Sequence, residues 1–258
     1  MKNKNLHSAK WQHTLCALSA CAALSGAAQA NNYTYGWSGN LTLGFEHATG
    51  TTNSRDVHAS LTLEHNKDFQ ASLPFRHRLR AAVDTEKTKA DDGTETKTRD
   101  KDAISYQLGY FLDPQSHIRA TLAYLHDISL KVDAGKVASI EYIRNVLTSS
   151  AHQLNLGIGV AYLDYAYTDT RPEVEEVGGQ ISYDYTGQLT EDFSLHHEGL
   201  LQATADLRYA TLDTGISYAL TQNMSLSLTH HYSTLSDDVG NRDDERNSTT
   251  HLTIGVTF

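Results

Sequence analysis

Cysteine is almost missing from this chain of 258 residues: it occurs twice, as Cys16 and Cys21. Proline is nearly as scarce, with three residues, and acidic side chains outnumber basic ones by 31 to 21. Beyond residue 30 there is no thiol for a disulfide or for thiolate chemistry. The acidic balance argues against nucleic acid as a partner, because nucleic-acid binding needs a basic face.

The first thirty residues have the three parts of a secretory signal peptide. Lys2, Lys4 and Lys10 make a basic start, an apolar run follows, and Ala28-Gln29-Ala30 supplies the cleavage pattern. We expect residues 1–30 to be removed, which leaves one domain over residues 31–258 with 18 basic against 31 acidic residues. In an alternative reading, Leu18-Ser19-Ala20-Cys21 is a lipoprotein processing site that leaves Cys21 acylated.

Long hydrophobic runs are also missing. After the leader, no segment approaches the roughly 18 uninterrupted apolar residues that a membrane helix needs. The chain instead alternates apolar and polar residues, which is the period of a β-strand. The predicted strands are Tyr35–His47, Val57–Asn66, Leu73–Thr85, Ala103–Leu112, His117–Ile128, Val137–Leu147, His152–Tyr167, Glu176–Gln188, Phe193–Gln202, Leu207–Leu220, Met224–Leu235 and Ser248–Phe258.

Twelve alternating strands fit either a soluble β-sandwich or a transmembrane barrel. Charges in the middle of the polar faces suit a watery lumen, and the number of strands exceeds that of a sandwich. Short turns alternate with longer polar links such as Glu86–Asp102, as turns and loops do in outer-membrane barrels. An aromatic girdle is predicted from residues near strand ends, namely Tyr33, Tyr35, Trp37, Tyr165, Tyr167 and Tyr185. We therefore predict an all-β fold, a transmembrane antiparallel up-and-down β-barrel of about twelve strands.

The last predicted strand, Ser248–Phe258, is expected to close the barrel. Leu252, Ile254, Val256 and Phe258 alternate with small polar residues. An unpaired apolar strand at the end of a sheet promotes aggregation, whereas a closed barrel has no such edge. We expect this strand to pair with Tyr35–His47 and to turn its apolar side chains toward lipid.

Several short motifs resemble a known family. They are Tyr35-Gly36-Trp37-Ser38-Gly39, Leu43-Gly44, Thr49-Gly50-Thr51-Thr52-Asn53, Tyr110-Phe111-Leu112, Gly157-Ile158-Gly159 with Tyr162, and the final Phe258. Together they resemble the salt-induced outer-membrane protein family, also called YdiY-like, although that family's usual turn reads Gly-Asn-Thr. The resemblance implies a barrel in the outer membrane. It implies no established activity and no catalytic residues.

The most distinctive charged pattern is a ladder of Arg76, Arg78 and Arg80. Its spacing of two places all three guanidinium groups on one face of one strand. Inside a lumen the ladder could select anions, as charged rings do in pores. Alternatively it forms a network of ion pairs with Glu46, Glu64 and other lumen acids, because charges away from bulk water need partners.

A second polar group is predicted in the lumen. By strand parity His196, Glu198, Asp213 and His231 point inward from three consecutive strands. With Ser227 they could form the Ser/His/Asp site of a lipid hydrolase or hold a metal. No serine signature accompanies them, so we expect polar packing, no catalytic residues, no metal and no cofactor.

The expected location is the outer membrane of a Gram-negative bacterium. The expected partners are outer-membrane lipid, lipopolysaccharide and, during insertion, the barrel assembly machinery. For function, we expect a structural or envelope-stress role or a small-solute channel, with the lipid hydrolase as the alternative.

Overall fold

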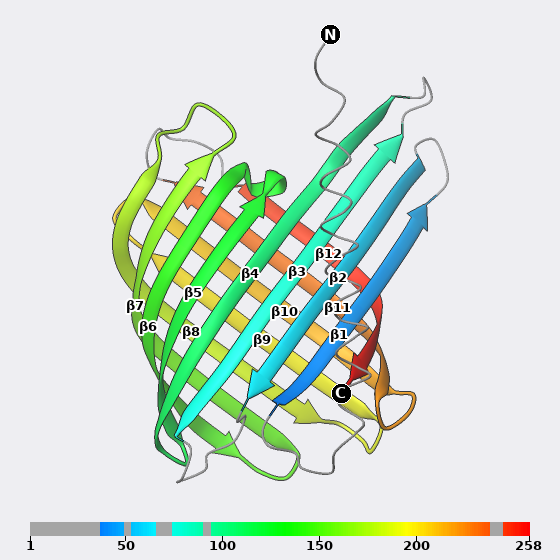
Figure 1. Cartoon of the computed structure of the whole chain (residues 1–258), viewed down its shortest axis with the longest axis vertical. Coiled ribbons are helices and arrows are strands. Elements are labelled where there is room, and N and C mark those ends of the chain that lie inside the picture. The colour runs from blue at the N-terminus through cyan, green and yellow to red at the C-terminus, as the bar shows by residue number, and fades with distance from the viewer. Residues whose placement is uncertain (1–36, 49–52, 66–73, 90–93, 238–244) are drawn as a thin grey trace.

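A computed structural model describes residues 37–48, 53–65, 74–89, 94–237 and 245–258. In these residues twelve antiparallel strands each pair with their neighbours in sequence, and the last pairs with the first. The sheet is thereby closed into an up-and-down barrel of tilted strands (Figure 1). The predicted leader lies outside the described residues, as do Tyr33 and Tyr35.

The structure confirms the predicted twelve-stranded barrel. Among the described residues, a short 3-10 helix, η2 (Ile128–Leu130), lies between two of the strands. The strands are β1 (Trp37–Ala48), β2 (Asn53–His65), β3 (Phe75–Lys89), β4 (Glu95–Asp113), β5 (Ser116–Asp127), β6 (Val132–Thr148), β7 (His152–Tyr167), β8 (Val174–Gln188), β9 (Phe193–Ala203), β10 (Leu207–Ala219), β11 (Met224–Asp237) and β12 (Glu245–Thr257).

The barrel turns its apolar side chains outward. Large exposed apolar residues fall on alternate positions of the strands, as Ile158, Val177 and Leu252 do at 65%, 70% and 61% exposed. So large an exposed apolar surface marks contact with a membrane and excludes a sandwich with an apolar interior. No helix among the described residues is long and apolar enough to cross a membrane.

The link predicted at Glu86–Asp102 is largely wrong. β3 continues to Lys89 and β4 starts at Glu95, so most of this segment is a charged hairpin. The strands pair through backbone groups, and Glu86 lies opposite Arg99 in the register. Backbone pairing needs no apolar face, and opposite charges across a strand pair add to it. Charge therefore did not end these strands.

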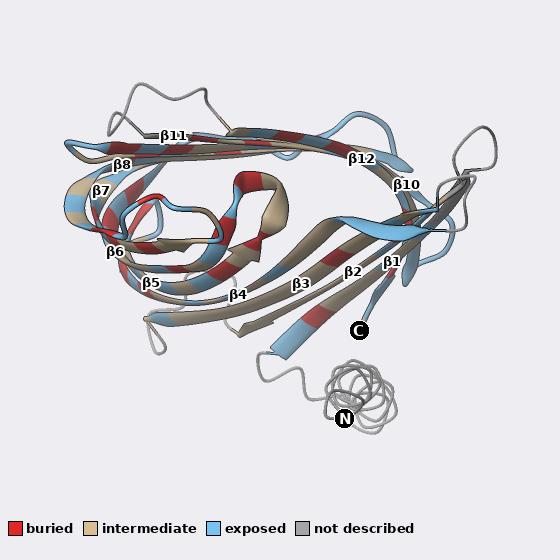
Figure 2. Cartoon of the chain, turned by 90° about the horizontal axis from the view of Figure 1, so that it is seen from above, coloured by how far each residue is buried: buried red, intermediate tan, exposed pale blue. Residues whose placement is uncertain are grey.

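An apolar cluster fills one mouth of the barrel, at the end that carries the β5–β6 and β7–β8 links. Figure 2 shows the flattened ring from above. Tyr165 is fully buried in the cluster, so its predicted place in the outer girdle is wrong. We call this cluster the mouth plug; its members are Leu125, Leu130, Val132, Ala161, Leu163, Tyr165, Val174, Leu207, Tyr209 and Leu235.

The β5–β6 link holds the mouth plug in place. The Asp127 side chain caps η2 by accepting hydrogen bonds from the backbone N–H groups of Ser129 (2.9 Å) and Leu130 (3.3 Å). Lys131 then ends η2 in a left-handed conformation (φ 55°), and its ammonium contacts Glu245 of β12 at 2.5 Å. The link is thereby tied across the mouth to the last strand.

Truncating the mouth plug is expected to loosen the barrel. Leu130→Ala should lower the free energy of unfolding by at least about 2 kcal/mol, because Leu130 is fully buried and its loss leaves a cavity. Leu189→Ala is the control: its side chain is 54% exposed, and we expect a change within about 0.5 kcal/mol. Denaturant titration of the barrel in detergent micelles measures both. Equal effects would contradict a packed plug.

β1 and β12 form the seam that closes the barrel, as predicted. Their register runs from Asn40↔Thr257 to Gly44↔Thr253. Beyond it, Gly39 and Phe258 exchange two backbone hydrogen bonds of 2.8 and 3.0 Å. A Cβ at Gly39 would lie 2.4 Å from the Phe258 ring, so this ring covers the glycine on the outer face. Leu252, Ile254 and Val256 are exposed on that same face.

Candidate functional site

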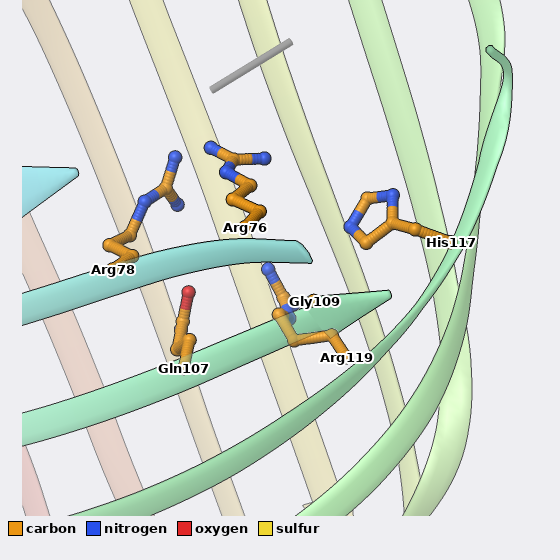
Figure 3. A pocket seen from close by; sticks show the side chains of 6 residues that line it. All are labelled: Arg76, Arg78, Gln107, Gly109, His117 and Arg119. Atoms are coloured by element: carbon orange, nitrogen blue, oxygen red, sulfur yellow. The ribbon is translucent and has the colours of Figure 1, made fainter. Parts of the chain in front are cut away.

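The arginine ladder of β3 lies inside the lumen. Arg76 and Arg78 project from the same side of their strand (Figure 3). Arg76 donates to Glu64 Oε1 at 2.9 Å, and Arg78 Nε donates to the same oxygen. One carboxylate from β2 therefore serves two neighbouring guanidinium groups. The side chain of Glu46, the other predicted partner, lies outside the described residues.

The third rung, Arg80, reaches across the lumen. Its Nη1 lies 3.2 Å from Oε1 of Glu198 on β9. β3 and β9 are not neighbours in the closed sheet, so this ion pair joins opposite walls. The ring is flattened when seen from above (Figure 2), and the Arg80 and Glu198 side chains meet across it. Charged side chains therefore occupy the lumen at the height of Arg80 and Glu198.

A basic recess lies beside the ladder, away from the mouth plug. Arg119 is held by Glu141, whose Oε1 accepts from Arg119 Nε at 2.6 Å and whose Oε2 accepts from Ser182 at 2.7 Å. Three arginines of this region thus face two carboxylates, Glu64 and Glu141. The recess is lined by Arg76, Arg78, Gln107, Gly109, His117 and Arg119 (Figure 3).

The predicted polar cluster is divided into two pairs. His196 Nε2 lies 3.5 Å from Glu198 Oε2, so His196 joins the Arg80 ion pair. Asp213 Oδ1 contacts His231 Nδ1 at 2.6 Å, and His231 Nε2 contacts Lys101 Nζ at 2.7 Å. Both pairs lie in the lumen, as strand parity predicted, but each has a cationic partner from β3 or β4 that the sequence did not indicate.

The Ser/His/Asp arrangement is not assembled. Both ring nitrogens of His231 are occupied, one by Asp213 and the other by Lys101. Ser227 instead shares a hydrogen bond of 2.8 Å with Ser217 of β10. It lies four residues from His231 along β11, which is about 13 Å in an extended strand. A serine nucleophile needs its base within hydrogen-bond distance, and His231 is not within that distance of Ser227.

The part of the chain that forms these strands matches a known protein family. Residues 41–258 match the model of a family described as a protein of unknown function, DUF481. The chain belongs to the DUF481 family. The match covers every described strand except the start of β1, so the DUF481 region and the barrel are the same unit.

Solved structures similar to this DUF481 barrel are outer-membrane barrels. An outer membrane channel from Pseudomonas putida F1 matches with a TM-score of 0.50 at 10% identity, over 89% of this chain and 100% of that one. The NanC porin matches with a TM-score of 0.44 at 14% identity, over 85% and 98%. These likenesses concern the fold alone. A search of curated proteins finds no match.

Proposed function

We propose that this protein is exported through its N-terminal leader to the outer membrane of a Gram-negative bacterium and acts there as a closed barrel. In this proposal its role is non-enzymatic, structural or connected with envelope stress. The resemblance to the salt-induced outer-membrane protein family supports the envelope-stress role. The occupied nitrogens of His231 support the absence of lipid hydrolysis at that position.

The observation that carries the proposal is the ion pair between opposite walls. Arg80 and Glu198 meet inside the barrel, and the mouth plug closes one end above them. Charges inside a barrel are stabilised when they are paired, and an unpaired charge is costly there. A lumen built this way resists the passage of solutes because passage requires the ion pairs to separate.

Conductance in planar lipid bilayers tests the closed barrel. We expect the wild type to remain near bare lipid. Arg80→Ala/Glu198→Ala should produce conductance steps more often, since it removes the pair between the walls. The matched control is Lys136→Ala/Asp164→Ala, which removes a 2.8 Å pair between adjacent strands and should leave the record unchanged. Steady large steps in the wild type would contradict the closed barrel.

A small-solute channel is the second candidate, and the basic recess favours it. Three arginines around one recess would concentrate anions in a water-filled passage. If the wild type conducts, a salt gradient should then show anion preference, and Arg78→Glu should reduce or reverse it. If the wild type conducts and Arg78→Glu has the same ion selectivity, that result would contradict the channel candidate.

A further inference from the structure

Three side chains with metal-binding atoms come together inside the barrel from three strands. His58 lies on β2, Asp84 on β3 and His251 on β12, and each offers a ligand atom within 4.8 Å of the others. His251 Nε2 is 3.2 Å from Asp84 Oδ2. The rings of His58 and His251 stack with their centroids 4.5 Å apart. None of the three belongs to the arginine ladder or to the basic recess.

Polar atoms in this group lack hydrogen bonds. Within the part of the chain that the structure describes, no hydrogen-bond partner is found for His58 Nδ1 or the nearby Asp56 Oδ1, and Asp84 Oδ1 has a 3.5 Å ion pair with Arg99 in place of a hydrogen bond. Asp56 and Asp84 are only 7% and 6% exposed. Buried polar atoms in folded proteins are nearly always satisfied. Several such atoms in one place, all of ligand type, therefore point to a bound group.

Charge around the three residues points to a divalent cation. Arg99 Nη1 contacts Asp56 Oδ2 at 2.7 Å and Asp84 Oδ1 at 3.5 Å, while its Nη2 lies 3.5 Å from Glu86. One guanidinium therefore faces three carboxylates. With neutral imidazoles the group carries a net charge of −2, which one divalent cation balances. The neighbouring Lys101 already contacts His231, the partner of Asp213.

We infer that His58, Asp84 and His251 form a binding site for a divalent transition-metal cation, with Zn²⁺ as its natural chemistry. Two imidazole nitrogens and one carboxylate oxygen are zinc ligands, at roughly 2.0–2.2 Å from the ion. Tetrahedral ligands at that distance lie about 3.4 Å apart, and the three ligand atoms lie within 4.8 Å of one another, so on binding they approach each other by at most about 1.4 Å. Arg99, through its contact with Asp84, orients the carboxylate ligand.

The site lies where the barrel seam ends. The β1–β12 register stops at Gly44↔Thr253, and His251 is two residues further along β12, on the same face as Thr253. A metal held by His251, His58 and Asp84 joins β12 to β2 and β3 across β1. The bound cation would thus link β12 to β2 and β3 at the point where the described backbone pairing between β1 and β12 ends.

Metal titration of the full-length folded barrel tests the site. The protein is purified in detergent, stripped with EDTA, and titrated with Zn²⁺ or Co²⁺. We expect one tight equivalent, the visible absorption of tetrahedral Co²⁺, and a higher unfolding temperature on heating in SDS. His58→Ala and His251→Ala should each weaken binding by more than about tenfold and abolish the thermal shift.

A matched control separates this site from ordinary histidine binding. His196→Ala removes another lumen histidine, one whose described contact is with Glu198, and should bind Zn²⁺ as the wild type does. Asp84→Asn keeps the side-chain volume, so it replaces an alanine variant in the same titration if that variant fails to fold. Absence of a tight equivalent in the folded wild type would overturn the proposal. Equal weakening in His196→Ala and His251→Ala would also overturn it.

Discussion

Glu141→Ala is expected to lower the free energy of unfolding of the barrel by about 3–5 kcal/mol. The Glu141 side chain is 1% exposed and holds both Arg119 and Ser182. Its removal leaves the Arg119 guanidinium inside the lumen without its carboxylate, and an uncompensated charge costs more than the ion pair itself contributes. Denaturant titration in micelles or vesicles measures the change.

The surroundings of Glu141 limit how far repacking can compensate for its loss. Gly157 and Gly159 of β7 face it, and a Cβ on either would lie 2.5 Å from a Glu141 atom. The two glycines of Gly157-Ile158-Gly159 therefore make room for this carboxylate. The two glycines bring no side chain of their own toward Arg119, which would keep its 3.4 Å contact with the Ser182 hydroxyl but lose its carboxylate partner.

Two further variants separate charge from packing at Glu141. Glu141→Gln keeps the hydrogen-bond acceptor but not the charge, so its cost should lie between those of wild type and Glu141→Ala. Glu175→Ala removes an exposed carboxylate that accepts from Tyr162 and should cost within about 0.5 kcal/mol. If Glu141→Ala costs no more than Glu175→Ala, the Arg119–Glu141 pair does not stabilise the lumen.

Much of the fold could be predicted because one rule governs it. Strand period two, applied to each segment, predicted twelve strands, and β7 has the predicted bounds, His152–Tyr167. Errors arose where polarity was used to end a strand, as at Glu86–Asp102. Tyr165 was assigned to the girdle by its place near a strand end, although its parity with Leu163 placed it inside. The alternation of side chains along a strand therefore predicted strand ends and residue faces better than local polarity or position near a strand end.

The side-chain partners could not be predicted in the same way. Parity says which face a residue occupies, and it placed Arg80, Glu198 and His231 in the lumen. It does not say how flattened the barrel is, and that shape decides that Arg80 meets Glu198 while Lys101 meets His231. Contacts across a lumen depend on the diameter and tilt of the whole barrel, which no local pattern contains.

The cluster of His58, Asp84 and His251 was missed for a related reason. Metal motifs in sequences are recognised by short spacings, whereas these residues lie on β2, β3 and β12 and meet only after closure. Parity places all three on the lumen face, which was an available signal. Without the seam register, however, nothing distinguished them from the other lumen histidines.

Deletion of Phe258 is expected to impair assembly more than the lost apolar burial alone explains, which is about 2–3 kcal/mol. The deletion removes the ring that covers Gly39 and both backbone hydrogen bonds at the start of the seam. The sheet has no free edge only when β1 and β12 pair. A weakened seam therefore leaves two strand edges open to pairing with other chains. The folded fraction, measured by mobility shift on heating in SDS gels, should fall sharply.

Phe193→Ala supplies the comparison that decides the role of the terminal residue. Phe193 is exposed on the outer face and packs against Tyr218 with ring centroids 4.8 Å apart, so its loss removes similar apolar area away from the seam. Gly39→Val should act in the same direction as the deletion but more weakly, because it displaces the Phe258 ring and keeps the backbone pair. If the deletion and Phe193→Ala assemble equally well, Phe258 contributes only its surface. If the deletion alone fails, the two residues Gly39 and Phe258 act as the closing contact of the barrel.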